Sequence, residues 1–176
     1  MNIQLPMHME KSAFLAWVEG REGRYELDGG RVVMMTGGSR AHSQIIGNLF
    51  RALDKRLDSD TWAILADFGV DVGPNSIRYP DIVVEPVSDT PRDLTAIAPV
   101  LVIEVLSPSN QPRKIQRHRL AAFSGGTREF WVVDPAGQTV EVSLPGSSSV
   151  IYTVEDLVPV TVLPGVALPL RKLFEV

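Results

Sequence analysis

The sequence predicts an α/β fold in which helices pack against a mixed sheet, with an antiparallel hairpin near the N-terminus and a strand extension at the C-terminus. Apolar residues recur at helical spacing in the segment 42–58, and a second helical segment covers 112–124. Three strand-like segments lie between these helices, and another strand follows the second helix. The order helix, three strands, helix, strand favours a mixed sheet covered by helices.

Length and composition agree with this fold class. The 176 residues suit a single domain spanning 1–176, and 44% hydrophobic with 22% charged residues is ordinary globular composition. The absence of cysteine excludes a disulfide framework and a thiolate zinc site. We expect a cytoplasmic protein without membrane association, because no signal sequence and no apolar run of about 20 residues is present. The net charge of −4 counts only weakly against nucleic-acid binding, because binding depends on where positive charge lies.

The N-terminal region is expected to form a helix and a hairpin. Residues 11–18 present one apolar side, as a short helix would. The strands 24–27 and 31–35 flank Asp28-Gly29-Gly30, a turn signal because glycine adopts positive φ at little cost. Residues 36–39 are read as a loop, since a lone Gly-Gly pair is usually a turn and seldom a phosphate cradle.

The middle of the chain is expected to supply the first core helix and three strands. Helix 42–58 is amphipathic, with charged residues opposite its apolar stripe. Segments 62–70 and 78–85 are predicted as two strands joined by the turn Gly73-Pro74-Asn75. Pro80 fits only near the start of its strand or at a sheet edge.

The third strand and the second helix follow a polar connection. Residues 89–99 form this connection, with at most a helical turn. The segment 100–106 is apolar on both faces, which is typical of a central strand. Ser109 or Asn110 is expected to cap helix 112–124, and Gly125-Gly126 to end it.

The C-terminal part is expected to extend the sheet. Residues 129–135 form a strand whose aromatic residues belong to the core, and a turn returns the chain as 139–144. A further short strand covers 150–154. The remaining Val-, Leu- and Pro-rich tail is expected to wrap back over the sheet.

Two of the apolar strands carry a carboxylate each. A carboxylate in such a strand is costly unless it is paired or holds a cation. Side chains alternate along a strand, so Asp81 and Glu104 can converge on one ion if their strands are neighbours. Divalent ions such as Mg²⁺ prefer carboxylate oxygens, and one or two carboxylates commonly hold them. The pattern therefore predicts a Mg²⁺ or Mn²⁺ site for phosphodiester hydrolysis, with Lys114 and His118 one turn apart on the helix behind it.

The motifs around these carboxylates resemble a known family. Pro80-Asp81, the segment Glu104 to Ser109 (EVLSPS) and the segment Glu129 to Pro135 (EFWVVDP) are similar to those of the Uma-type restriction endonuclease-like family. That family belongs to the PD-(D/E)XK nuclease superfamily, and the resemblance runs nearly end to end. It implies a helix, three-strand, helix, strand core and a metal-dependent endonuclease acting on DNA, in which Asp81 and Glu104 are the metal ligands.

One departure from the superfamily pattern concerns the catalytic lysine. The superfamily places it two residues after the glutamate, where this chain has Leu106. Uma-type members carry it in the following helix, at the position of His118 here. Three alternatives stay open: Lys114 reaches the same place from one turn away, His118 takes over as a neutral base, or activity has been lost.

Other polar residues receive weaker expectations. The resemblance suggests that Glu26 and His42 face the metal pocket, although His42 is equally read as a backbone-bonded residue at a helix start. Arg113, Arg117 and Arg78 are expected to contact DNA phosphates. Glu85 and Asp67 are read as solvated charges at strand ends. The position of Ser107 gives no Gly-x-Ser-x-Gly motif, so a serine hydrolase is not expected.

Three functions remain in competition on the sequence alone. The first is a metal-dependent DNA endonuclease, with a homodimer expected only by analogy with nucleases that cut both strands. The second is an inactive descendant that binds nucleic acid or a protein partner. The third is a structural protein whose carboxylates are paired internally with Arg78 or Lys114.

Overall fold

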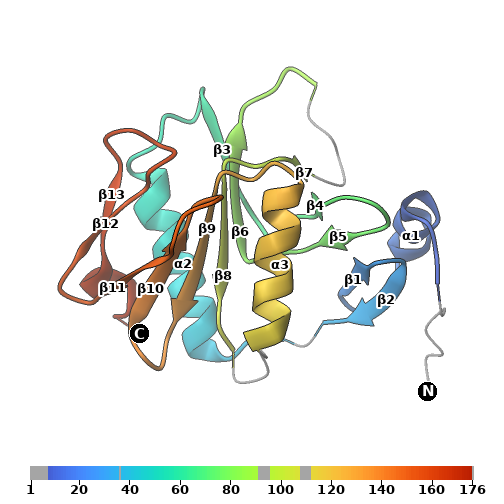
Figure 1. Ribbon diagram of the computed structural model, residues 1–176, viewed down its shortest axis with the longest axis horizontal. Coiled ribbons are helices and arrows are strands. Elements are labelled where there is room, and N and C mark those ends of the chain that lie inside the picture. Colours follow the sequence, from blue (N-terminus) through green and yellow to red (C-terminus); the bar gives the residue numbers. More distant parts are fainter. Residues whose placement is uncertain (1–7, 36, 91–95, 108–111, 176) are drawn as a thin grey trace.

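The computed structural model describes residues 8–35, 37–90, 96–107 and 112–175. Its two larger sheets lie side by side (Figure 1). The larger sheet consists, in spatial order, of β11 (Val150–Thr153), β10 (Thr139–Ser143), β9 (Glu129–Asp134), β8 (Leu101–Val105), β6 (Ile82–Pro86) and β3 (Trp62–Ala66). The smaller sheet consists of β2 (Arg31–Met34), β1 (Tyr25–Asp28), β5 (Ile77–Arg78), β4 (Val70–Asp71) and β7 (Ala96–Ile97). A third sheet pairs β12 (Leu157–Pro159) with β13 (Ala167–Pro169).

Among the described residues, four helices accompany these sheets. They are α1 (Lys11–Val18), α2 (Arg40–Asp54), α3 (Pro112–Ser124) and α4 (Leu170–Leu173). The strand β6 pairs antiparallel with both β3 and β8, whereas β9 returns parallel to β8 after the α3 crossover. The predicted fold class is therefore confirmed: a helix, three strands, a helix and a strand form the core, with an N-terminal hairpin and a C-terminal strand extension.

The two faces of the larger sheet bury different helices (Figure 1). The α2 helix packs Ile45, Leu49 and Leu53 into a cluster that includes Ile103. The α3 helix packs on the other face, in a cluster that includes Val102. Because side chains alternate along β8, Glu104 shares the α3 face with Val102.

The strands predicted at 62–70 and 78–85 are each divided between the two sheets. The first ends at Ala66, because Asp67 adopts φ 53° and turns the chain toward β4. The second is interrupted at Tyr79 and Pro80, between β5 in the smaller sheet and β6 in the larger one. Asp81 consequently lies immediately before β6, at the junction between the sheets, and not inside a continuous strand.

The start and end of α2 also differ from the prediction. Ser39 Oγ accepts a hydrogen bond from the backbone N–H of His42, so the helix begins at Arg40, two residues before the predicted start. The helix ends at Asp54, four residues before the predicted end, with Lys55 as its C-cap residue. The predicted capping residues Ser109 and Asn110 of α3 lie outside the described residues.

The remaining predictions hold with small changes. The connection 89–99 contains the short strand β7, which pairs parallel to β4. The C-terminal tail covers the α2 face of the larger sheet, burying Val158, Leu168 and Leu173 there. Among the described helices, none combines the length and the apolar character needed to cross a lipid bilayer.

Candidate active site

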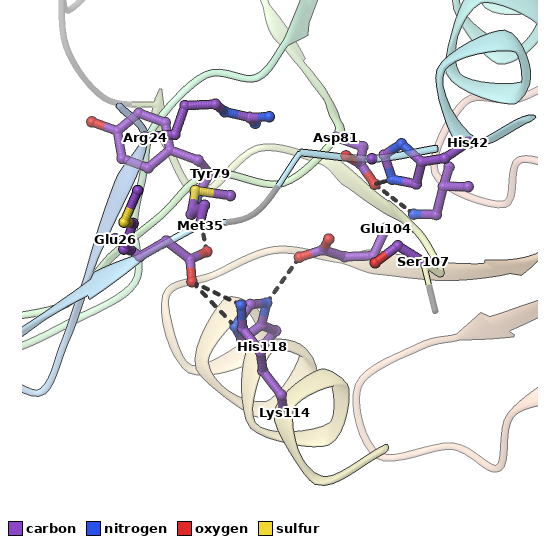
Figure 2. A pocket seen from close by; sticks show the side chains of 13 residues that line it. Arg24, Glu26, Met35, His42, Tyr79, Asp81, Glu104, Ser107, Lys114 and His118 are labelled. Carbon is purple, nitrogen blue, oxygen red and sulfur yellow. Dashed lines mark hydrogen bonds and ion pairs between the residues drawn. The ribbon is translucent and has the colours of Figure 1, made fainter. Parts of the chain in front are cut away.

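A pocket of about 250 Å³ opens where the two sheets meet the start of α2 and one side of α3 (Figure 2). We call it the carboxylate pocket. Its charged and titratable lining comes from five separate parts of the chain: Arg24, Glu26, His42, Tyr79, Asp81, Glu104, Lys114 and His118. Most of the residues singled out in the sequence therefore meet in one place.

Strand pairing brings Asp81 and Glu104 together. Ile82 of β6 pairs with Ile103 of β8 in antiparallel register, so the next step of the ladder sets Asp81 opposite Glu104. The backbone N–H of Val105 donates a 2.7 Å hydrogen bond to Asp81 Oδ2. Both side chains line the carboxylate pocket, and the strands β6 and β8 are neighbours.

His42 holds Asp81 from the other side. Its Nε2 atom lies 3.3 Å from Asp81 Oδ2. The hydrogen bond to Asp81 raises the pKa of His42, and partial burial opposes this effect. Gly38 lies directly against the imidazole: a Cβ atom at this position would lie 2.3 Å from His42 Nδ1. The site thus needs a residue without a side chain at 38.

Glu104 is held by His118. Oε1 of Glu104 lies 2.9 Å from Nδ1 of His118, and both residues are buried. Burial raises the pKa of Glu104, whereas His118 acts in the opposite direction. A buried carboxylate with a raised pKa is typical of functional sites and less common in purely structural ones.

Glu26 is the third carboxylate in the pocket, and it is almost completely buried. Its Oε2 atom lies 3.3 Å from Lys114 Nζ, 3.6 Å from an Arg78 guanidinium nitrogen and 3.8 Å from His118 Nε2. These three contacts are ion pairs without a hydrogen bond to Oε2. The other oxygen, Oε1, accepts a hydrogen bond from the backbone N–H of Tyr79. Glu26 therefore lies close to three basic side chains, those of Lys114, Arg78 and His118.

The three arginines expected to contact DNA are in different environments. Arg78 is buried, with 6% of its side chain exposed, and it donates a hydrogen bond of 2.5 Å to Asp28. It therefore links β5 to β1 within the smaller sheet, and its contact with a DNA phosphate stays a prediction. Arg113 and Arg117 are exposed on α3, and Arg117 lies 3.8 Å from Asp28.

The donor set fits a small divalent cation held by few ligands. One oxygen of each carboxylate, Asp81 Oδ2 and Glu104 Oε1, is engaged in a hydrogen bond. Within the described ranges, no three His, Asp or Glu side chains form a metal-binding cluster. Two carboxylates suit Mg²⁺, which usually keeps several water ligands and takes one or two from protein.

Several lining residues received no role from the sequence. Arg24, Tyr79, Met34, Met35 and Gly38 all border the pocket. The neighbouring Pro80-Asp81 motif could have pointed to Tyr79 as a pocket residue. For Gly38, the only such indication in the sequence was its position just before the predicted helix. Arg24, by contrast, forms an ion pair with Asp67, a contact between residues 43 positions apart that no local pattern reveals.

Of the remaining candidates, none lies at the centre of the site. Leu106, at the superfamily lysine position, packs against the α3-side hydrophobic cluster. Glu85 is on β6, and partial burial raises its pKa. Asp67 is not simply solvated, because it is paired with Arg24.

Comparison with known proteins gives a family and a fold. The Uma2 family model, described as "Putative restriction endonuclease", matches residues 12–171. A similar solved structure is a putative nuclease belonging to DUF820 from Anabaena variabilis ATCC 29413, with 24% identity and a TM-score of 0.83. The match covers 94% of this chain and 97% of the other. No curated protein matches the chain.

Proposed function

Because this chain belongs to the Uma2 family of putative restriction endonucleases, we propose that it hydrolyses phosphodiester bonds of DNA with the help of Mg²⁺ or Mn²⁺. The observation that carries the proposal is the meeting of Asp81 and Glu104 in one pocket, on the face of β8 that carries α3. The two cations Lys114 and Arg24 line the same pocket and suit an anionic substrate.

Asp81 and Glu104 would hold the metal. When bound, such an ion supplies positive charge that stabilises the negative charge developing on the scissile phosphate. The protein keeps both carboxylates in place through groups that do not themselves need to touch substrate. His42 and the Val105 N–H fix Asp81, and His118 fixes Glu104.

Lys114 is the group that we assign to the attacking water or the phosphate oxygens. Its side chain is 35% exposed and reaches the pocket, whereas the side chain of His118 is 6% exposed and lies between two carboxylates. A half-exposed ammonium can follow a substrate, but a buried imidazole is restricted to holding Glu104. Glu26 would keep the Lys114 ammonium at the pocket.

Arg113 and Arg117 would contact DNA phosphates next to the pocket. Both are exposed on α3, the helix that also carries Lys114. Such contacts position the duplex and carry no sequence information.

A second candidate function rests on Leu106. The superfamily lysine position carries a partly buried apolar side chain packed against the α3-side hydrophobic cluster, so the same fold could serve as a DNA- or protein-binding descendant without activity. The third function, in which Arg78 or Lys114 neutralises the metal-site carboxylates, has less support. Among the described residues both cations contact Glu26, and neither contacts Asp81 or Glu104.

A plasmid assay tests the proposal. Supercoiled DNA is incubated with the wild type in Mg²⁺, Mn²⁺ or EDTA, and with Asp81→Ala and Glu104→Ala. We expect nicking or linearisation that needs both the metal and both carboxylates. Cleavage that persists in EDTA or in either variant would refute it.

Thermal unfolding separates an inactive metal-binding protein from one without a metal site. A ligand that binds only the folded state raises the melting temperature. We expect Mn²⁺ to stabilise the wild type and to have no such effect on Asp81→Ala. Stabilisation without cleavage would favour the inactive descendant.

A further inference from the structure

A second pocket, of about 320 Å³, lies on the opposite side of the larger sheet from α3, between α2 and α4. We call it the basic pocket, because four of its nine lining residues are cations: Arg51, Lys55, Arg56 and Lys172. Glu175 is the only carboxylate side chain in its lining.

These four cations have no carboxylate partner in the part of the chain that the structure describes. Within the described residues, none of them forms an ion pair. Arg51 donates to the amide oxygen of Asn48, and Arg56 donates to the backbone oxygen of Ala52, both of which are uncharged partners. Many other cations of this acidic protein do have carboxylate partners, including Lys11, Arg24, Arg78, Arg119 and Arg171.

The walls of the basic pocket are fixed relative to each other. Asn48 Nδ2 on α2 donates to the backbone oxygens of Leu173, at 3.0 Å, and Glu175, at 3.1 Å. Leu173 is buried against the α2-side core. The two elements that carry the cations are therefore held together around the cavity, and all four cationic side chains are exposed.

A structural explanation accounts for only part of this arrangement. Positive side chains near a helix C-terminus interact favourably with the helix dipole, which explains Arg51, Lys55 and Arg56 at the end of α2. It does not explain Lys172, which comes from a separate element and faces the same cavity. Four like charges around one cavity repel one another unless an anion occupies it.

We propose that the basic pocket binds a phosphate group through Arg51, Lys55, Arg56 and Lys172. The phosphate can belong to a DNA backbone or to a free phosphate-bearing ion. The backbone source rests on the proposed nuclease function. Along α2, the basic pocket is about 14–20 Å from His42 at 1.5 Å per residue, or roughly four to six base pairs of duplex at 3.4 Å each.

The test compares two double variants that remove equal charge. Lys55→Ala/Lys172→Ala empties the basic pocket of two cations. Arg128→Ala/Arg171→Ala is the matched control, because both side chains are exposed and lie outside both pockets. Arg171 is next to Lys172 in the sequence but pairs with Glu155. The control therefore shows whether an effect depends on losing charge inside the basic pocket or merely near it. Thermal melts in chloride buffer establish that both variants fold.

The first arm uses inorganic phosphate as the probe, titrated calorimetrically into EDTA-treated protein against chloride of equal ionic strength. The second arm measures binding of a fluorescein-labelled DNA duplex in EDTA as salt is raised. For a backbone phosphate, we expect the Lys55/Lys172 variant to bind DNA about tenfold more weakly, with a salt slope smaller by about two. The control should match the wild type.

Each pattern of results has one meaning. Loss of phosphate binding with unchanged DNA binding supports the free ion as the ligand. Loss of DNA binding in the Lys55/Lys172 variant alone supports the backbone. Equal effects of the two double variants, or no effect in either arm, overturn the proposal. Since no step requires cleavage, and Asp81→Ala can serve as the background, failure of the nuclease proposal would be seen separately.

Discussion

His118 Nδ1 lies 2.9 Å from Glu104 Oε1, which joins the crossover helix α3 to the central strand β8 inside the protein. Glu104 is therefore anchored by a side chain fourteen residues further along the chain. This contact indicates different roles for the two basic residues of α3 that line the carboxylate pocket. His118 orients a carboxylate from within, and Lys114, one turn earlier, remains partly open to solvent.

The first prediction concerns this division between Lys114 and His118. Lys114→Ala should reduce plasmid cleavage by about 10²- to 10⁴-fold, the range typical of a lost proton-transfer or charge-stabilising group. His118→Ala should leave a larger residual rate, because its loss misplaces Glu104 without removing a group that contacts substrate. Arg113→Ala, one residue from Lys114, is the control and should weaken DNA binding with little change in the cleavage rate at saturation. The reverse order of the Lys114 and His118 variants would assign the role to the imidazole.

The second prediction concerns pH and His42. The contact with Asp81 raises the folded-state pKa of His42 above its value of 6.5 in the unfolded chain. The protonated imidazole therefore stabilises the folded protein below pH 6.5, and this contribution is lost as pH rises through the folded-state pKa. His42→Gln should lower the melting temperature more at about pH 6 than at about pH 8.5. Thermal unfolding of both proteins at the two pH values checks this, and a loss of melting temperature that grows with pH would contradict it.

The third prediction concerns the close approach of Gly38 to His42. In Gly38→Ala the new methyl group would displace the imidazole, so the His42 pKa should fall toward its ordinary value. Loss of this support for Asp81 should cost roughly tenfold or more in cleavage rate, as small misplacements of catalytic groups do. Gly37→Ala is a matched control, because its Cβ would have nothing within 4 Å. NMR titration of the histidines distinguishes the two variants, and identical titration curves would count against the role of Gly38.

The fourth prediction separates Arg78 from the exposed arginines. Removing one partner of a buried ion pair typically costs 3–5 kcal/mol, so Arg78→Ala should destabilise the protein by about 3 kcal/mol. Arg113→Ala should change stability by no more than about 0.5 kcal/mol. The two variants should differ in the opposite order in DNA binding. Arg113→Ala should reduce the salt dependence of DNA affinity by about one unit of slope, and Arg78→Ala should have the smaller effect. Urea unfolding and salt-dependent anisotropy test the pair; a stable Arg78→Ala with weakened DNA binding would restore the DNA-contact assignment.

Local sequence patterns predicted much of the fold because the core elements are regular. The strand β8 is apolar on both faces, and α3 begins and ends at the predicted residues. The divided strands were not predicted, because the apolar pattern continues through Phe68 while the backbone turns at Asp67. Such a turn depends on the second sheet, which a short window of sequence does not contain.

The candidate site divides in the same way. The convergence of Asp81 and Glu104 follows from the two-residue periodicity of neighbouring strands, which is a local property. The surroundings of Arg78 depend on Glu26 and Asp28, about fifty residues away, so its proximity to Asp81 in the sequence did not reveal that it is buried and ion-paired. The role of Gly38 depends on where one imidazole points, which no spacing rule gives.

The carboxylate pocket takes Glu26 from the smaller sheet and Asp81 and Glu104 from the junction and the larger one. If heating unfolds the hairpin of β1 and β2 before the rest of the protein, Glu26 leaves the carboxylate pocket while the larger sheet and its helices stay folded. The temperature at which cleavage disappears would then fall below the temperature of global melting. Inactivation would be readily reversible, since only the hairpin has to dock again.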